Sequence, residues 1–341
     1  MISGVMENLL AGKDLDGSTM EGVMEAMLAG ELSPAVIGGF LIGLRAKGES
    51  VTEITAAAKV MRRHAKGIPV PQGVPLLDTC GTGGDGTGTF NISTASAIVA
   101  AAGGATVAKH GNRSVSSKSG SADVLEALGV SLSLTVERLG EVLEEVGISF
   151  LFAPAHHAAT RHAVGPRREL GVRTLFNVLG PLTNPAGAKR QVMGVYARSL
   201  VEPLATVLRD LGAEHAIVVH GADGLDEFSI SGESFVSEVR DGEVTSYTVT
   251  PAQVGLEVAP LSTLIGGDAE VNADIIRSIF AGHSGAPSDA VALNAGAALY
   301  VSGEADSLAS GVSLAQNLLK SGAAEAKLEE LVLATNSESG D

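Results

Sequence analysis

Residues 81–94 constrain the fold of this chain more than any other segment. The stretch is rich in glycine and in small hydroxyl and amide side chains, unlike an ordinary core segment. Apolar residues 74–77 lead into it and helix-forming residues 95–102 follow, which predicts a loop between a strand and a helix. Backbone N–H groups at such a junction, beside the positive end of a helix dipole, bind phosphate oxygens. We therefore expect the chain to handle a phosphorylated small molecule.

The same stretch also matches the dinucleotide pattern G-x-G-x-x-G at Gly81, Gly83 and Gly86. That fingerprint requires a helix at the third glycine and an acidic residue about twenty positions later. Here more loop-forming residues follow Gly86, and the downstream region offers Lys109 and His110. These departures disfavour a dinucleotide fold. A Walker A loop is excluded because no Gly-Lys pair is followed by Ser or Thr.

The composition indicates a folded protein, since 45% of the 341 residues are hydrophobic. This length suits two domains, or one large α/β domain with an appendage. No apolar run approaches the roughly 18 residues of a membrane span, and the N-terminus lacks the pattern of a signal peptide. A single cysteine, Cys80, cannot form a disulfide framework, so we expect a cytoplasmic protein.

The charge balance argues against nucleic acid or an anionic membrane as a partner. The chain carries 23 Lys and Arg against 39 Asp and Glu, a formal charge of −16. Residues 109–190 are nevertheless slightly basic, whereas the remainder is strongly acidic. A local basic field of this kind suits a multiply charged anion, although a solvated surface would give the same counts.

The first seventy residues indicate short helices, which cannot close a core alone and should pack on the rest of the chain or on a second subunit. Capping signatures mark three helix starts: Ser18 with Glu21, Ser33 with Pro34, and Ser50 with Glu53. We expect a helical domain over residues 1–72, joined by a segment near 165–190, and an α/β catalytic domain over residues 73–341.

Strand-like and helical segments then alternate, which predicts a mostly parallel central sheet covered by helices. The expected strands are residues 76–80, 106–108, 148–152, 191–195 and 216–220. The expected helices are residues 94–102, 122–128, 136–146 and 201–211. Residues 228–250 predict an antiparallel excursion with a turn at Asp241-Gly242, and helices return from residue 273. The fold class is therefore α/β, with a small N-terminal helical domain.

Residues 109–121 form a second polar segment, with three cations, His110, Asn112 and five serines. The segment follows a predicted strand, so it should lie at the same sheet edge as the glycine-rich loop. Ligands of parallel sheets collect outside the carboxyl ends of the strands. We therefore expect a functional segment.

Five blocks of sequence together resemble anthranilate phosphoribosyltransferases: residues 78–85, 89–94, 109–113, 167–185 and 224–227. They occur in the order and with the spacing of that family. The resemblance implies the helical and α/β architecture shared with pyrimidine nucleoside phosphorylases, and a homodimer formed through the helical domain. It also implies transfer of the phosphoribosyl group of phosphoribosyl pyrophosphate to anthranilate, with release of pyrophosphate, in tryptophan biosynthesis.

The resemblance also assigns residues to ligands. Those implied to hold phosphoribosyl pyrophosphate are Gly81, Gly84, Asp85, Thr89, Asn91, Ile92, Ser93, Thr94, Lys109, Ser117 and Ser121. Those implied to bind Mg²⁺ are Ser93, Asp226 and Glu227, and those implied to bind anthranilate are Asn112 and Arg167.

These residue types suit the chemistry. Breaking the ribosyl C–O bond places negative charge on the leaving group, which calls for backbone donors, a cation and Mg²⁺. Adjacent carboxylates with a hydroxyl give Mg²⁺ hard oxygen ligands. The aromatic amine is already neutral near pH 7, so positioning by Arg167 is expected to matter more than a base. His110 is a candidate acceptor for the departing proton, and orienting the loop is an equal alternative.

Some features depart from the family or suggest other functions. His156 and His157 do not have metal-ligand spacing, so we expect no zinc site. Ala158 stands where the family has proline, and Gly165-Pro166 replaces its Pro-Val, which alters the expected anthranilate entrance. A pyrimidine nucleoside phosphorylase is an alternative on the same architecture. A nucleic-acid-binding relative should be basic, unlike this chain.

Overall fold

The N-terminal part of the chain is helical, as the capping signatures predicted. The computed structural model describes residues 2–114 and 118–337. Its first helices are α1 (Ile2–Leu10), α2 (Gly17–Leu28), α3 (Pro34–Lys47) and α4 (Val51–His64). Ser33 caps α3 ahead of Pro34, and Ser50 forms a capping box with Glu53, so both predicted starts are confirmed.

The predicted cap at Ser18 is wrong. Asp16 caps α2 by accepting a 2.8 Å hydrogen bond from the Thr19 N–H, and the Ser18 hydroxyl donates to the same carboxylate. An ionised side chain two residues earlier is a stronger acceptor for the free N–H groups of the first turn.

A single sheet forms the centre of the described structure, with strand order β3-β2-β1-β4-β5-β6-β7. Its strands are β1 (Leu76–Asp78), β2 (Thr106–Gly111), β3 (Ile148–Phe152), β4 (Arg190–Gly194), β5 (His215–Gly221), β6 (Ser234–Arg240) and β7 (Glu243–Val249). Strands β1 to β5 are parallel, and β6 and β7 are antiparallel. The predicted turn is confirmed, because Asp241 and Gly242 have φ of 53° and 80°.

The order of the strands places a topological switch between β1 and β4. From β1 the chain moves outward to β2 and β3, and it then returns to the other side of β1 as β4. Loops that leave β1 and β4 therefore diverge, which opens the ligand-binding crevice of such sheets.

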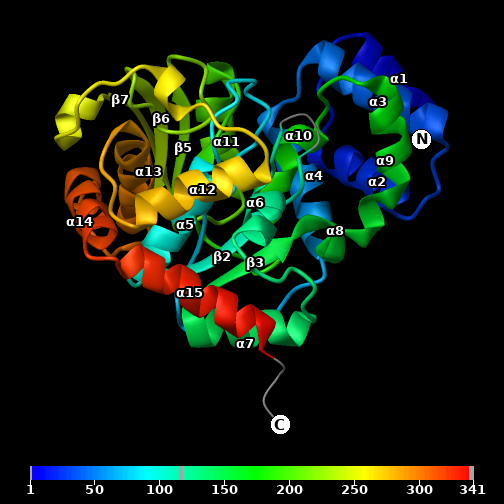
Figure 1. Ribbon diagram of the computed structural model, residues 1–341. Coiled ribbons are helices and arrows are strands. Elements are labelled where there is room, and N and C mark those ends of the chain that lie inside the picture. The colour runs from blue at the N-terminus through cyan, green and yellow to red at the C-terminus, as the bar shows by residue number, and fades with distance from the viewer. Residues whose placement is uncertain (1, 115–117, 338–341) are drawn as a thin grey trace.

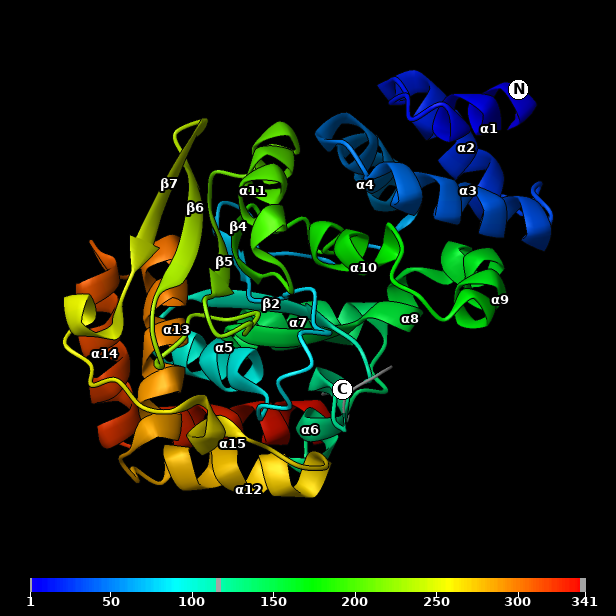
Figure 2. The same cartoon turned by 90° about the horizontal axis from the view of Figure 1, so that it is seen from above.

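Helices cover both faces of the sheet (Figure 2). They are α5 (Ile92–Ala102), α6 (Ser121–Ala127), α7 (Val136–Val146), α11 (Val201–Asp210), α12 (Ala269–Phe280), α13 (Ala286–Ser302), α14 (Leu308–Lys320) and α15 (Ala323–Asn336). Successive side chains of β5 point to opposite faces of the sheet, and each face has its own hydrophobic core. Ile217 and Val219 join the core of α5 and α13, whereas Ala216 and Val218 join that of α11 and the N-terminal helices.

A later segment returns to the N-terminal helices, which lie to one side of the sheet (Figure 1). It contains α8 (Ala153–His156), α9 (Arg161–Leu170) and α10 (Phe176–Leu179). Ala163, Phe176 and Leu179 are buried in one cluster with Met20 and Phe40. The polypeptide therefore passes between the helical and sheet-containing parts more than once.

Two strand ends differ from the prediction. The first strand stops at Asp78, and β2 continues past residue 108 to Gly111 because Lys109, His110 and Gly111 pair with residues 150–152 of β3. Polar residues that the sequence assigned to a loop are thus strand residues. No helix in the described part of the chain combines the length and apolar character needed to span a membrane.

Candidate active site

The glycine-rich loop lies at the topological switch, between β1 and α5. Gly83, Gly84, Gly86 and Gly88 have φ of 63°, 75°, 79° and 73°, a conformation in which a side chain would be strained. The Thr82 N–H donates to the Gly194 carbonyl at the end of β4 over 2.9 Å. The loop is thus tied to both strands of the switch point.

The second half of this loop is held by the segment before α12. Thr89 forms an antiparallel bridge with Ile265, and the Phe90 N–H donates to the Leu264 carbonyl over 3.0 Å. Asn91 then occupies the N-cap of α5, and its side chain makes no capping bond. The first turn of α5, with Ile92, Ser93 and Thr94, therefore begins at the predicted anion site.

Asp85, Asp226 and Glu227 form a cluster of carboxyl groups. The Asp226 N–H donates to Asp85 over 3.3 Å, and the Ser93 N–H donates to Glu227 over 3.1 Å. Burial and the neighbouring Asp85 and Glu227 raise the pKa of Asp226 well above its ordinary value. Burial also raises the pKa of Glu227, to about 7, and Lys109 only partly offsets this.

This cluster fits a divalent cation. Carboxylates that repel one another in a poorly hydrated place are stabilised when a cation neutralises them. Asp226, Glu227 and the Ser93 hydroxyl are hard oxygen donors of the kind Mg²⁺ prefers. Gly194 allows the approach, because a Cβ there would overlap the Asp226 carbonyl oxygen.

Lys109 brings a buried positive charge to the same place. Its side chain is 3% exposed, and its ammonium donates to the Thr79 hydroxyl over 2.9 Å. Thr79 in turn donates to the Ser93 carbonyl. Among the described residues no carboxylate forms an ion pair with Lys109. The charge is therefore available to an anion.

Asp78 lies at the end of β1, beside Lys109 and Thr79, and accepts hydrogen bonds from neighbouring segments. Its buried carboxylate accepts hydrogen bonds from the N–H groups of Cys80 and His110 and, over 2.7 Å, from Asn184. Burial raises the pKa of Asp78 to about 6, although Asn184 and Lys109 oppose that rise. Asp78 thus holds the ends of β1 and β2 together.

Asp78, Cys80 and His110 bring potential ligand atoms within 4.8 Å of one another. Asp78 is already committed to three donors. Burial also raises the pKa of the Cys80 thiol, which stays protonated and is a poor metal ligand. We therefore interpret this group as structural.

Three histidines lie close to the end of β2. The Nδ1–H of His110 donates to the Gly180 carbonyl over 3.1 Å, and the His110 ring centroid lies 5.1 Å from that of His157. Burial, followed by the charge of His157, lowers the pKa of His110 to about 3. Burial also lowers the pKa of His157 to about 4, and that of His156. All three rings are neutral near pH 7.

Arg167 lies on α9 beside the same segment. Its guanidinium carbon is 4.8 Å above the Phe176 ring, and burial lowers its pKa. Among the described residues no acidic side chain pairs with it. Arg167 stacks on Phe176 and His110 contacts the Gly180 carbonyl, so both contact residues 176–180, which we call the 176–180 wall. A weakly hydrated, unpaired guanidinium there suits a carboxylate.

Asn112 directly follows β2 and is exposed, whereas Ser121 begins α6 and is half-buried. The Ser121 hydroxyl donates to the Asn112 carbonyl over 3.2 Å, and the Asn112 side chain accepts from the Arg113 N–H. Gly111 permits this approach, because a Cβ there would overlap the Ser121 hydroxyl. Ser117 lies outside the described residues. The predicted basic field is weakened, since Arg113 pairs with Asp123 and Glu126.

Four polar residues support the site although no sequence pattern assigned them a role. Asn184 and Asp78 were inside the quoted blocks, but nothing in the sequence showed their contact. Asn272, on α12, donates to Asn91 over 2.9 Å, and no local pattern indicated it. Arg173 donates to the Gly84 carbonyl and stacks 4.1 Å over the Tyr196 ring.

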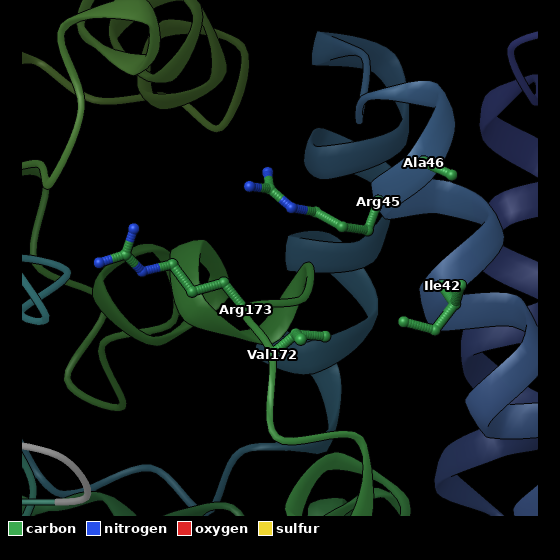
Figure 3. A pocket seen from close by; sticks show the side chains of 5 residues that line it. All are labelled: Ile42, Arg45, Ala46, Val172 and Arg173. Atoms are coloured by element: carbon green, nitrogen blue, oxygen red, sulfur yellow. The ribbon is translucent and has the colours of Figure 1, made fainter.

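Arg173 also lines an open pocket with Arg45, Ile42, Ala46 and Val172. Figure 3 shows the Arg45 and Arg173 side chains extending to the same side, away from Ile42 and Ala46. Arg173, which lines this pocket, also contacts the glycine-rich loop at the Gly84 carbonyl.

Comparison with known families first defines a class. Residues 73–325 match the α/β domain of a glycosyl transferase family, and residues 4–65 match the helical bundle domain of that family. The chain therefore has the two domains of that glycosyl transferase family.

Closer relatives define the particular family. An anthranilate phosphoribosyltransferase of Thioalkalivibrio sulfidiphilus is 57% identical over 324 residues, which cover 95% of this chain and 96% of the relative. That of Acetivibrio thermocellus is 52% identical, with 99% and 97% covered. The chain belongs to the anthranilate phosphoribosyltransferase family and is an enzyme.

Solved structures agree with this assignment. The anthranilate phosphoribosyltransferase of Thermus thermophilus has a TM-score of 0.92 at 48% identity, covering 97% of this chain and 99% of that one. The enzyme of Saccharomyces cerevisiae in complex with PRPP and Mg has a TM-score of 0.89 at 26% identity, covering 99% and 98%. The predicted α/β fold with an N-terminal helical part is confirmed.

Proposed function

We propose that this chain transfers the phosphoribosyl group of phosphoribosyl pyrophosphate to the amine of anthranilate. The products are N-(5-phosphoribosyl)anthranilate and pyrophosphate, in L-tryptophan biosynthesis. One observation carries the assignment of residues: a buried lysine without a carboxylate partner among the described residues, a cluster of carboxyl groups and a glycine-rich loop converge at the topological switch. Such a site binds a diphosphate together with a metal ion.

The leaving group is assigned to the glycine-rich loop, the first turn of α5 and Lys109. Gly81, Gly84 and Asp85 begin the loop, and Thr89 to Thr94 lead into α5. As the ribosyl C–O bond breaks, negative charge grows on the diphosphate, and prearranged N–H groups and a buried ammonium stabilise it. Ser117 and Ser121 are assigned to the same substrate.

Asp226, Glu227 and Ser93 would hold Mg²⁺. When bound, Mg²⁺ neutralises charge on the diphosphate and so makes it a better leaving group. The hydrogen bond from the Ser93 N–H fixes Glu227 against α5. The chain itself thus sets the distance between the acidic pair and the phosphate-binding turn.

Anthranilate is assigned to Arg167 and Asn112. The guanidinium pairs with the carboxylate, which aims the aromatic amine at the sugar. A His110 with a pKa near 3 is a weak base, and its bond to the Gly180 carbonyl favours a role in orienting the 176–180 wall. The amine attacks without prior deprotonation, and the proton leaves afterwards to water.

The decisive experiment follows the loss of anthranilate fluorescence with purified protein, phosphoribosyl pyrophosphate and Mg²⁺. We expect turnover in the wild type and none in the Asp226→Asn, Glu227→Gln double variant, with unchanged circular dichroism. The matched control is Asp274→Asn, an exposed carboxylate on α12. Full activity of the double variant would reject the metal assignment. Cleavage of a pyrimidine nucleoside by phosphate, without anthranilate transfer, would favour the phosphorylase alternative.

We further propose a homodimer formed through the helical part. Leu10, Ile42, Val164 and Val172 are large apolar residues with 80%, 38%, 52% and 53% exposure, and they belong to α1, α3, α9 and the segment after α9. Exposed apolar groups on neighbouring elements are typical of an interface. Light scattering of the wild type should give twice the monomer mass. The Leu10→Asp, Val164→Asp double variant should give a mass closer to that of the monomer.

The division into residues 1–72 and 73–341, with the segment near 165–190 joining the helical part, remains a proposal. The burial of Ala163 and Phe176 beside Met20 supports it. Limited proteolysis should cut near residues 66–73 first. A cytoplasmic location is likewise proposed, since a single cysteine suits a reducing compartment, and cell fractionation tests it.

A further inference from the structure

Asn272 is a buried polar residue of α12 that no part of the proposed reaction uses. Its side chain is 2% exposed, and it contacts two segments at the edge of the active site. Its Oδ1 accepts from the Gly267 N–H over 2.7 Å, and its Nδ2 donates to Asn91 Oδ1 over 2.9 Å. We propose that Asn272 is a positioning residue that sets the orientation of the Asn91 amide toward the diphosphate. The inference rests on the proposed role of Asn91.

The direction of each hydrogen bond is fixed by the backbone. The Gly267 N–H can only donate, so the atom of Asn272 that faces it must be the carbonyl oxygen. The amide nitrogen of Asn272 then faces Asn91, and the atom of Asn91 that receives this bond must be Oδ1. The chain of hydrogen bonds from Gly267 through Asn272 to Asn91 therefore assigns the oxygen and nitrogen of both side-chain amides. For an isolated asparagine this assignment would be open.

This order leaves the amide nitrogen of Asn91 as the donor on the opposite side. Its Nδ2 donates to the Ser119 carbonyl over 3.3 Å, which uses one of two hydrogens. Among residues 2–114 and 118–337 no other acceptor takes the second hydrogen, which we assign to an oxygen of the diphosphate at the start of α5. If Asn91 were turned by 180°, it would present a carbonyl oxygen to the diphosphate, and the two would repel each other. The Asn272 donor, over the shorter contact of 2.9 Å, acts together with the Ser119 carbonyl at 3.3 Å to exclude the wrong orientation.

Close packing prevents Asn272 from relaxing. Gly266 lies between it and the glycine-rich loop, where an added Cβ would overlap Asn272 Oδ1 and lie 2.8 Å from the Phe90 nitrogen. The Gly266 N–H donates to the Gly88 carbonyl over 2.9 Å. The loop, the 264–267 segment and α12 are therefore one packed unit, which connects a helix distant in sequence with the phosphate-binding turn.

The first test replaces Asn272 by aspartate, which has the same shape and keeps the acceptor for Gly267 but removes the donor to Asn91. We expect the KM for phosphoribosyl pyrophosphate to rise by about tenfold to a hundredfold, the loss expected for one hydrogen bond to a charged group. The KM for anthranilate should be unchanged. Asn336→Asp is the matched control, because that exposed asparagine bonds to Gly129 at the end of α15.

A double-mutant cycle separates positioning from a general structural role. If Asn272 acts through Asn91, Asn272→Asp should weaken substrate binding strongly in the wild type and hardly at all in an Asn91→Ala background. An equal loss in both backgrounds, or an unchanged KM in the folded Asn272→Asp protein, would overturn the proposal. Should Asn272→Asp fail to fold, Asn272→Ser keeps a hydroxyl near Gly267 but is too short to reach Asn91.

Binding of inorganic pyrophosphate with Mg²⁺, measured by calorimetry, gives a readout independent of turnover. We expect the Asn272→Asp protein to bind pyrophosphate more weakly than the wild type. Adding Asn91→Ala to that variant should not weaken binding further. If the wild type binds pyrophosphate in this pattern but does not consume anthranilate, the acceptor assignment fails and the positioning role stands. If anthranilate is consumed normally but the effects of Asn272→Asp and Asn91→Ala simply add, the positioning role of Asn272 is wrong and the proposed function is unaffected.

Discussion

The backbone N–H of Ser93 donates a 3.1 Å hydrogen bond to Oε1 of Glu227. The bond joins the first turn of α5 to the acidic turn after β5, two segments that are 134 residues apart in the chain. The phosphate site proposed at the helix and the cation site proposed at the turn are thereby held in one fixed relation.

Removing the charges of the acidic pair should make the metal-free protein more stable. The raised pKa values of Asp226 and Glu227 show that their ionised forms are disfavoured where they lie. In EDTA we expect Asp226→Asn, Glu227→Gln to melt at or above the wild-type temperature. Millimolar Mg²⁺ should raise the melting temperature of the wild type only. A Mg²⁺ shift of equal size in the double variant would place the cation elsewhere.

Loss of the Arg167 guanidinium should weaken anthranilate binding selectively. We expect Arg167→Ala to raise the KM for anthranilate by about tenfold to a hundredfold, because a charge-assisted hydrogen bond contributes roughly 1.5–3 kcal/mol. Arg167→Lys should restore only part of the anthranilate affinity, since an ammonium lacks the two parallel N–H donors of a planar guanidinium. The control is Arg168→Ala, the exposed neighbour. Steady-state kinetics with each substrate varied in turn will check this, and an unchanged anthranilate KM would remove Arg167 from the site.

A methyl group at Gly194 should displace the acidic pair. The Cβ of Gly194→Ala would overlap the carbonyl oxygen of Asp226, and neither backbone segment can yield without moving β4 or the turn. Overpacking of this kind costs about 1–3 kcal/mol or more. We expect a lower urea midpoint and a loss of turnover. Gly232→Ala is the matched control, because its Cβ would meet nothing within 4 Å. Normal activity in Gly194→Ala would show that the turn tolerates displacement.

Glu238 should make stability depend on pH in the acid range. Burial opposes its ionisation, but hydrogen bonds from His215, Tyr247 and Tyr300 outweigh burial and lower its pKa below the ordinary 4.5. The stabilisation is therefore present above pH 4.5 and is lost as the pH falls through the lowered value. Glu238→Gln should cost about 1–3 kcal/mol at neutral pH.

Urea unfolding of the wild type and Glu238→Gln at several pH values measures this effect. The difference between the two proteins should narrow as the pH falls below 4.5. A difference that stays constant would mean that the carboxylate charge contributes nothing. Glu243→Gln, on the neighbouring exposed strand, is the control.

The elements of the fold were accessible from sequence because their signals are local. Helix α7 and strand β3 begin and end where periodicity predicted, and the Asp241-Gly242 turn joins two alternating strands. Errors arose where a distant partner decided the outcome. Strand β2 extends to Gly111 because β3 pairs with it, and nothing within residues 109–111 reveals that pairing.

The sequence by itself determined the class of site: a glycine-rich turn ahead of a helix, a lysine and an adjacent acidic pair, arranged in five family-specific blocks. Only the tertiary structure decided their environment. Burial and mutual repulsion set the pKa of Glu227, and the absence of a described carboxylate partner leaves Lys109 available to an anion. Asn272 reaches Asn91 from 181 residues away. Composition and spacing describe residues that are close along the chain. Electrostatics and hydrogen bonding depend instead on distances between residues far apart in sequence, which only tertiary packing establishes.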